Sequence, residues 1–330
     1  MNNSTQTNHT TPDSSAQTIN STTLSALPVL AWSAAYGTVA VMAVFGNSMV
    51  ITAFARNAGL HTRTNFFVVG LATADLLIGM FAVPLFISLF WHYTRNASIP
   101  EGLAKVFDAV DIFSSFASIF QLMLISLERC YAILYPVSHR NSSKLVYVLV
   151  LVSFWLFSGI LAMTQAFGKT NLGLKKAFFT LMWICYVVSF LVICVAYMGI
   201  WRKAKRRGGY GFQRKKRRQD REVMIAITVL IVIVVFIVTW LPFFTMNVLF
   251  FYDPAKGKGV PYEVVQFSKL LHYSNSAINP IIYSLKIPGF KKTFTSLLRR
   301  ESRSNGRSTT FSLTRRDSTR NSTRKPSTPV

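Results

Sequence analysis

Residues 223–251 read VMIAITVLIVIVVFIVTWLPFFTMNVLFF, a run of 29 residues without one charged side chain. A helix needs about 20 apolar residues to cross the hydrocarbon core of a bilayer. Backbone amides in hydrocarbon must find partners within the segment, and no barrel-like alternation is present, so helices are expected. The sequence therefore predicts an all-α membrane protein with seven spans, at 28–55, 65–91, 103–134, 145–167, 177–201, 223–251 and 262–285.

The overall composition supports this interpretation. The 330 residues are 51% hydrophobic and only 15% charged, whereas soluble domains carry about 25% charged residues. The 27 Phe, 12 Tyr and 6 Trp exclude a chain that is disordered throughout, and three cysteines cannot build a disulfide scaffold. The sequence contains no nucleophile elbow, phosphate loop or metal-ligand cluster, so we predict no enzyme.

The distribution of basic residues predicts the orientation. If the amino terminus is outside, the inner loops and the carboxy-terminal tail carry 28 of the 36 Lys and Arg residues. This asymmetry is typical of multi-pass proteins, whose cytoplasmic loops are basic. The net charge of +24 is therefore explained by topology in the plasma membrane. Residues 202–218 would attract anionic lipid, and no nucleic-acid partner is expected.

The two tails differ from the spans in composition. We predict an extracellular disordered tail (1–27), a seven-span domain (28–286), a short amphipathic eighth helix (287–299) and a cytoplasmic, disordered tail rich in Ser, Thr and Arg (300–330). Acceptor triplets predict N-glycosylation of the outer tail at Asn3, Asn8 and Asn20. In the inner tail, paired arginines precede Ser302 and Ser318 in a pattern typical of basophilic-kinase sites.

Ionisable residues inside the spans are few, and such residues usually have a function. Asp75 lies in the second span, and Glu128 and Arg129 lie at the end of the third. Trp240 and Pro242 mark the sixth span, and Asn275, Ser276 and Asn279 precede Pro280 in the seventh. Because proline interrupts helical hydrogen bonding, Pro242 should kink its helix.

Six motifs in this order resemble those of rhodopsin-like (class A) G-protein-coupled receptors, over about residues 28–298. They are Gly46-Asn47, Leu71 to Asp75, Glu128-Arg129-Cys130, Trp155, Phe236…Trp240-Leu241-Pro242 and Asn279-Pro280-Ile281-Ile282-Tyr283. The resemblance implies a receptor that binds an extracellular ligand within the bundle. It would activate a heterotrimeric G protein by outward movement of span six, with arrestin and receptor kinases as further partners.

The resemblance also implies an allosteric Na⁺ site and an activation switch; no other cofactor is expected. The sodium site would comprise Asn47, Asp75, Ser118, Trp240, Asn275, Ser276 and Asn279. One carboxylate among neutral oxygens suits a hard monovalent cation; the alternative is a polar network satisfied by water. The switch would comprise Glu128, Arg129, Tyr197, Glu222, Phe236 and Tyr283, and Ile119 would lie with Phe236 beneath Trp240. In the inactive state Glu222 would hold Arg129.

The chain departs from the family pattern in several places. Ala104 stands where the family has a disulfide cysteine, so we expect free thiols at Cys130, Cys185 and Cys194. This absence, Ser189 in place of a proline and the short second outer loop resemble melanocortin, cannabinoid and lysophospholipid receptors. Residues 75–84 and Asn247 resemble adenosine receptors instead.

The ligand site is expected at the outer mouth. Asp111 precedes Arg129 by 18 residues, or about 27 Å of helix. Asp111 and Tyr273 match the residues that hold the ammonium in amine receptors, so a small amine is the first hypothesis. The expected ligand residues are Asp108, Asp111, Ser115, Trp240, Phe243, Phe244, Asn247, Lys269 and Tyr273.

Lys269 complicates this hypothesis because it could pair with either Asp108 or Asp111. The pair would then be structural, or the ligand would be zwitterionic or anionic. An adenosine-like, melanocortin-like peptide or lipid ligand is the alternative, in which Asn247 could bind a nucleobase. An opsin is disfavoured because Tyr273 occupies the retinal-lysine position. A transporter is a remote alternative because no inverted repeat is visible.

Overall fold

The computed structural model describes residues 26–167, 172–206, 213–286 and 290–296, and these residues contain helices and no strand. The labelled elements are α1 (Ala26–Arg56), η1 (Ala58–Leu60), α2 (Arg63–Leu77), η2 (Ile78–Ala82), α3 (Val83–Thr94), α4 (Glu101–Leu134), α5 (Pro136–Asn141), α6 (Lys144–Phe167), α7 (Leu172–Arg206), α8 (Gln213–Tyr252), α9 (Pro254–Lys258) and α10 (Tyr262–Lys286). Residues 290–296 form one further helical segment.

The long helices form the predicted seven-transmembrane bundle. Within the described ranges, six helical stretches are long and apolar enough to cross a bilayer: Ala26–Arg56, Arg63–Thr94, Glu101–Leu134, Lys144–Thr164, Lys176–Lys203 and Ile233–Tyr252. The 25-residue α10 is the seventh, and it packs against α1 and α8. Residues 1–25 and 297–330 lie outside the described part, so the glycosylation and phosphorylation sites stay predictions.

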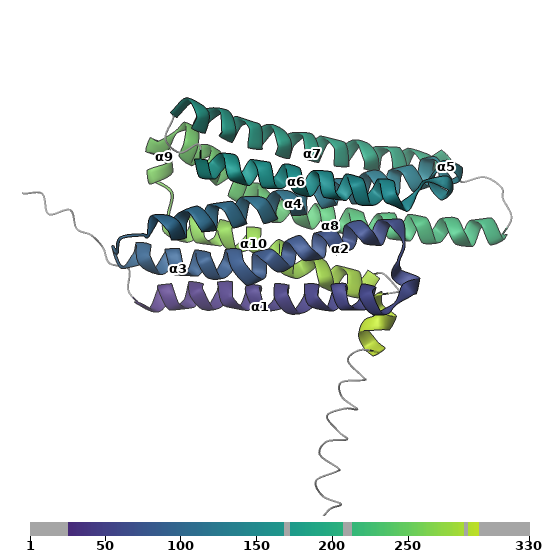
Figure 1. Cartoon of the computed structure of the whole chain (residues 1–330), viewed down its shortest axis with the longest axis horizontal. Helices are drawn as coiled ribbons and strands as arrows, with labels where there is room; N and C mark the ends of the chain where they lie inside the picture. Colours follow the sequence, from purple (N-terminus) through teal and green to yellow (C-terminus); the bar gives the residue numbers. More distant parts are fainter. Residues whose placement is uncertain (1–25, 168–171, 207–212, 287–289, 297–330) are drawn as a thin grey trace, which may run out of the picture.

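The helices run along one common direction (Figure 1), with α1 at one edge of the view and α7 at the other. Helix α4 packs against α2, α6 and α7 and is the central element. Every residue from 114 to 126 of this helix is buried. The side chains of α4 therefore meet those of the surrounding helices in the middle of the molecule.

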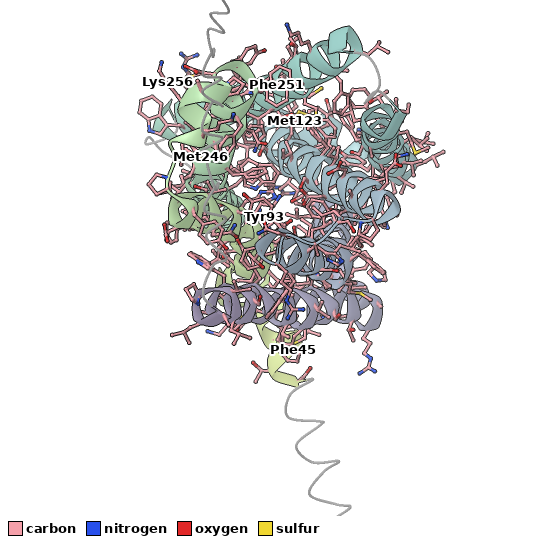
Figure 2. All side chains as sticks on the ribbon, turned by 90° about the vertical axis from the view of Figure 1, so that its left-hand side faces the viewer. Phe45, Tyr93, Met123, Met246, Phe251 and Lys256 are labelled. Atoms are coloured by element: carbon pink, nitrogen blue, oxygen red, sulfur yellow. The ribbon has the colours of Figure 1, made fainter. Side chains whose placement is uncertain are left out.

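Apolar side chains also cover the outside of the bundle. Phe45 of α1, Leu156 of α6 and Val195 of α7 are 61%, 65% and 61% exposed. The end-on view in Figure 2 shows Phe45 pointing away from the other helices. Soluble proteins rarely expose apolar surface on this scale, whereas lipid tails cover it without a penalty. The outer faces are therefore those of a protein embedded in a bilayer.

The second span has a local irregularity that the sequence did not predict. Five residues, Ile78–Ala82, form a π-helical turn between α2 and α3. Pro84 follows at the start of α3, and proline has no backbone N–H to donate to the preceding turn. A π-turn inserts one extra residue into the helix, so it changes the face that α3 presents to the bundle relative to α2.

The prediction of free thiols is confirmed. Cys130, Cys185 and Cys194 are all unpaired in the structure.

Candidate functional site

An ion pair joins α4 and α10 near the end of the bundle that holds α9. The ammonium Nζ of Lys269 lies 2.9 Å from Oδ2 of Asp111. The hydroxyl of Tyr273 donates a hydrogen bond of 3.1 Å to Oδ1 of the same carboxylate. The side chains of Lys269 and Asp111 are only 11% and 13% exposed. The choice between Asp108 and Asp111 is therefore settled, and Lys269 pairs with Asp111.

Four aromatic rings surround the Lys269 ammonium. Its Nζ lies 4.4 Å from the ring centroid of Phe243 and 4.7 Å from that of Tyr273. The centroids of Phe107 and Phe86 are 5.5 and 5.6 Å away. An ammonium within about 6 Å of a ring face is attracted by the negative face of the ring. We call these four rings and the Asp111 carboxylate the ammonium cage.

His272 lies beneath this cage and was not among the predicted ligand residues. Its ring stacks on Phe243 at a centroid distance of 4.4 Å and meets the edge of Trp240 at 4.2 Å. The residue is buried, and neither of its ring nitrogens has a hydrogen-bond partner within the described residues. The indole Nε1 of Trp240 also has none. Buried polar groups normally have partners. His272 and Trp240, which we call the cage floor, therefore have unused hydrogen-bonding capacity.

An aromatic stack continues from the cage floor into the bundle. Trp240 contacts Phe236 at 5.0 Å and Phe244 at 5.4 Å between ring centroids. Tyr186 of α7 stacks on Phe244 at 3.7 Å and also borders Trp240. Phe236 is buried against Trp240, and Ile119 is buried in the same hydrophobic cluster. Tyr186 was missed because nothing in the α7 sequence shows which face meets α8.

Three other predicted ligand residues lie near the cage but are not part of it. Ser115 is buried on α4, one turn beyond Asp111. Asp108 is half-buried one turn before Asp111. The amide nitrogen of Asn247 donates to the Phe243 carbonyl of its own helix at 2.8 Å. This bond uses one of the two N–H donors of the Asn247 amide.

Asp75 is the centre of a second polar cluster, fully buried between α2, α4 and α10. Its Oδ1 accepts hydrogen bonds from the hydroxyls of Ser276 (2.9 Å) and Ser118 (3.3 Å). Its Oδ2 accepts one of 2.8 Å from the amide of Asn279. The amide of Asn47 donates to the Ser276 carbonyl at 3.0 Å. The structure thus gathers most of the predicted sodium-site residues around one carboxylate.

Within the described residues, the amide oxygens of Asn47 and Asn279 in this cluster have no hydrogen donor, nor has that of Asn275, the residue next to Ser276; all three residues are buried. Neutral oxygens beside a carboxylate are the ligands that a hard cation prefers. The donor set therefore fits a monovalent cation, and an internal water network would fit the same atoms.

Arg129 is held at the opposite end of the bundle, at the end of α4. Its Nε and Nη2 donate to the two oxygens of Glu128, at 2.6 and 2.8 Å. Thr64 of α2 donates to Glu128 at 2.7 Å and accepts a hydrogen bond from Arg129. His139 of α5 lies 2.8 Å from the other Glu128 oxygen. Glu128 thus holds Arg129 through contacts from α2 and α5 that sequence spacing did not predict.

For two other switch residues, the structure describes the helix but not the side chain. Glu222 and Tyr283 belong to α8 and α10, but their side chains are outside the described residues. The predicted pair between Arg129 and Glu222 therefore stays a prediction. Tyr197 of α7 is half-buried and packs against the hydrophobic core.

Trp155 does not line the ammonium cage. It borders an apolar groove of about 940 Å³ between α2, α4 and α6, together with Gly70, Phe113 and Leu156. Leu156 in this lining is exposed on the outer face of the bundle, so Trp155 lies beside a surface that faces lipid and not beside the cage.

A bundle of seven membrane helices, with a buried carboxylate near one end and a clamped arginine near the other, defines a class of membrane receptors. The family model "7 transmembrane receptor (rhodopsin family)" matches residues 46–177 and 173–283. The chain belongs to this family. It is a G-protein-coupled receptor and not an enzyme.

Curated relatives cover most of the chain. "Trace amine-associated receptor 13c" of Danio rerio is 28% identical over 290 residues, covering 77% of this chain and 82% of its own. "Adenosine receptor A3" of Ovis aries is 28% identical, covering 79% and 87%. "Somatostatin receptor type 1" of Rattus norvegicus is 30% identical, covering 80% and 70%. The chain is similar to all three, whose names indicate three different ligand classes.

Proposed function

We propose that this receptor lies in the plasma membrane with its amino terminus outside and binds a ligand ammonium at Asp111. The ammonium cage carries this proposal. A carboxylate, an oriented hydroxyl and four ring faces form a site that suits an ammonium. The protein's own Lys269 ammonium is already held there, 2.9 Å from Asp111. A relative named for trace amines supports the same ligand class.

Because the chain is also similar to adenosine and somatostatin receptors, nucleosides and basic peptides are the alternative ligand classes. For a nucleoside, Asn247 is the residue that the sequence offers, but its amide nitrogen already donates within α8. For a basic peptide, Asp108 would be the first contact. Among the residues that the structure describes, neither alternative has a preformed set of contacts comparable to the ammonium cage.

Signal transmission would run through the aromatic stack. A ligand that enters the cage displaces Lys269 and presses on Phe243 and His272, which contact Trp240. Trp240 in turn packs on Phe236. Movement of α8 at this level would swing its far end outward, release Arg129 and open a cavity for a heterotrimeric G protein. Phosphorylation of the tail at Ser302 and Ser318 by a basophilic kinase would then dock arrestin, with receptor kinases as further partners.

A sodium ion at Asp75 would oppose this movement. The carboxylate and the partnerless amide oxygens of Asn47, Asn275 and Asn279 would hold it, with Ser118 and Ser276 oriented toward the same carboxylate. A bound cation would neutralise a charge that is costly to bury. The residues that hold it come from α1, α2, α4 and α10, so the ion would stabilise their inactive arrangement.

The test is agonist-dependent guanine-nucleotide exchange in cells, with a panel of amines, nucleosides and basic peptides. Wild type should respond to an amine, and Asp111→Asn should lose at least about 30-fold in potency, as expected when a buried charge loses its partner. Glu101→Gln removes a carboxylate from the exposed start of the same helix and should change nothing. A tagged surface-expression assay corrects for folding. A nucleoside or peptide response that ignores Asp111→Asn contradicts the proposal.

A further inference from the structure

The buried ion pair restricts the charge of the ligand. Lys269 and Asp111 are together neutral, and both side chains are largely shielded from solvent. Within the described residues, neither has another charged side chain at ion-pair distance. A charge in a low-dielectric pocket is stable only when it is paired. The net charge of the cage after binding therefore decides which ligands bind well.

Three kinds of charged ligand give three different results. A simple amine pairs with Asp111 and leaves the Lys269 ammonium buried without a counter-ion. A simple acid takes Lys269 and leaves the Asp111 carboxylate alone. A molecule with both groups replaces one internal ion pair with two ion pairs, and every charge stays compensated.

We propose that the ligand is a compact zwitterion of the amino-acid type. Its ammonium would bind Asp111, and its carboxylate would bind the displaced Lys269. This inference rests on the ammonium site proposed above and narrows it to amines that also carry an acid.

The local geometry supports this exchange. Tyr273 donates to Oδ1 of Asp111, not to the Oδ2 that binds Lys269. The Tyr273 hydroxyl can therefore hold the carboxylate in place while its cation is exchanged. Lysine carries its charge on a flexible four-carbon stem, so the ammonium can withdraw by one bond length or two and still reach a ligand acid.

The rings around the pair predict the rest of the ligand. Phe86, Phe107 and Phe243 lie around the Lys269 ammonium, so a side chain that enters with the zwitterion meets an apolar, aromatic wall. Next to this wall are the nitrogens of His272 and Trp240, which have no hydrogen-bond partner among the described residues. An aromatic amino acid, with or without a polar group on its ring, matches these surroundings.

The experiment uses three probes that share a phenylethyl group. Phenylalanine carries both charged groups, phenethylamine lacks the acid and 3-phenylpropionate lacks the amine. Tyrosine, tyramine and 3-(4-hydroxyphenyl)propionate form a second set, and leucine with its corresponding amine and acid a third. The full-length receptor is tested by nucleotide exchange in cells and by thermal stabilisation after purification. The variants are Lys269→Gln, Lys269→Arg and Lys256→Gln, the last an exposed lysine of α9.

In wild type, the amino acid of at least one set should be about 30-fold or more potent than its amine. Lys269→Gln should reverse this order, because the amine then leaves no buried cation behind. Lys269→Arg should keep the wild-type order, and Lys256→Gln should not affect it. A purely structural ion pair would lower expression or stability in Lys269→Gln without reversing the order of the probes.

The contrary outcomes distinguish the failure of the zwitterion proposal from the failure of the ammonium site. An amine as potent as its amino acid on wild type, or an unchanged order in Lys269→Gln, overturns the zwitterion assignment and leaves the ammonium site intact. Activation by the acid alone that survives Asp111→Asn overturns both proposals. Silence toward all three sets overturns the zwitterion assignment, whereas the ammonium site falls only if the wider panel of amines also fails to act through Asp111.

Discussion

Gly46 of α1 lies directly against Pro280 of α10. A β-carbon added to Gly46 would lie 2.8 Å from Cβ and 2.9 Å from Cγ of the proline ring. The ring is rigid and belongs to the helix that carries Asn279, one of the Asp75 partners. The absence of a side chain at Gly46 therefore sets how closely α1 approaches α10, and it brings Asn47 within 3.0 Å of the Ser276 carbonyl.

We predict that Gly46→Ala destabilises the receptor although alanine favours helix formation. The added methyl group must push α1 away from Pro280, and overpacking of this kind typically costs about 1–3 kcal/mol. The measurement is thermal unfolding of the purified receptor. Gly37→Ala in the same helix is the matched control, because a β-carbon there meets nothing within 4 Å. Equal melting temperatures for the two variants would show that the contact between Gly46 and Pro280 accommodates an added methyl group.

Sodium should stabilise the wild-type receptor and not Asp75→Asn. At a few times its dissociation constant, a bound ion adds about 1 kcal/mol. The measurement compares melting temperatures in sodium and potassium chloride at one ionic strength. Thr73→Val on the same helix is the control, because the Thr73 hydroxyl donates only to the Val69 carbonyl. A wild-type melting temperature that is the same in both salts contradicts the sodium site and favours internal water.

Thr64→Val should raise basal signalling. The Thr64 hydroxyl bridges α2 to the Glu128–Arg129 pair, and valine keeps the shape but removes both hydrogen bonds. Each hydrogen bond to a charged group contributes about 1.5–3 kcal/mol, so basal nucleotide exchange should rise several-fold at equal surface expression. Thr73→Val serves again as the control. The role of Thr64 is refuted if both variants signal like wild type without ligand.

Glu222→Gln tests the remaining part of the switch. If the Glu222 carboxylate pairs with Arg129 in the inactive state, its neutralisation should raise basal exchange, and Glu128→Gln should add to this effect. Asp220→Asn, which removes the same charge two residues earlier, is the control. No rise in Glu222→Gln would mean that Glu128, Thr64 and His139 hold Arg129 without α8.

His272→Phe should stabilise the free receptor and weaken its response. Phenylalanine keeps the stacking on Phe243. It removes two buried nitrogens that have no partner in the described part of the chain, and each costs about 1–3 kcal/mol when left unsatisfied. His92→Phe is the control: one nitrogen of His92 lies 2.8 Å from the Ser88 carbonyl, so its loss should bring no gain. A lower melting temperature of His272→Phe would indicate that the ring nitrogens have partners.

The candidate site could be predicted only in part. Asp75 and its partners were identified because they occur in motifs at fixed positions along single helices. The contact of Arg129 with Glu128 follows from adjacency in the chain. Tyr186 was not predicted, and His272 was not assigned to the ligand site, because no motif marks them and their role depends on neighbours from other helices.

The sequence alone determined the seven spans, since the bilayer requires about 20 apolar residues and internally satisfied backbones, and both are local properties. Only the tertiary structure decided that Lys269 binds Asp111 and not Asp108, which lies one turn away on the same face of α4. The π-turn at Ile78–Ala82 was also visible only in the structure. Hydropathy locates the segment of each helix that lies in the bilayer, whereas the ends of the helix, as in α8 (Gln213–Tyr252), and its rotation depend on contacts that hydropathy does not describe.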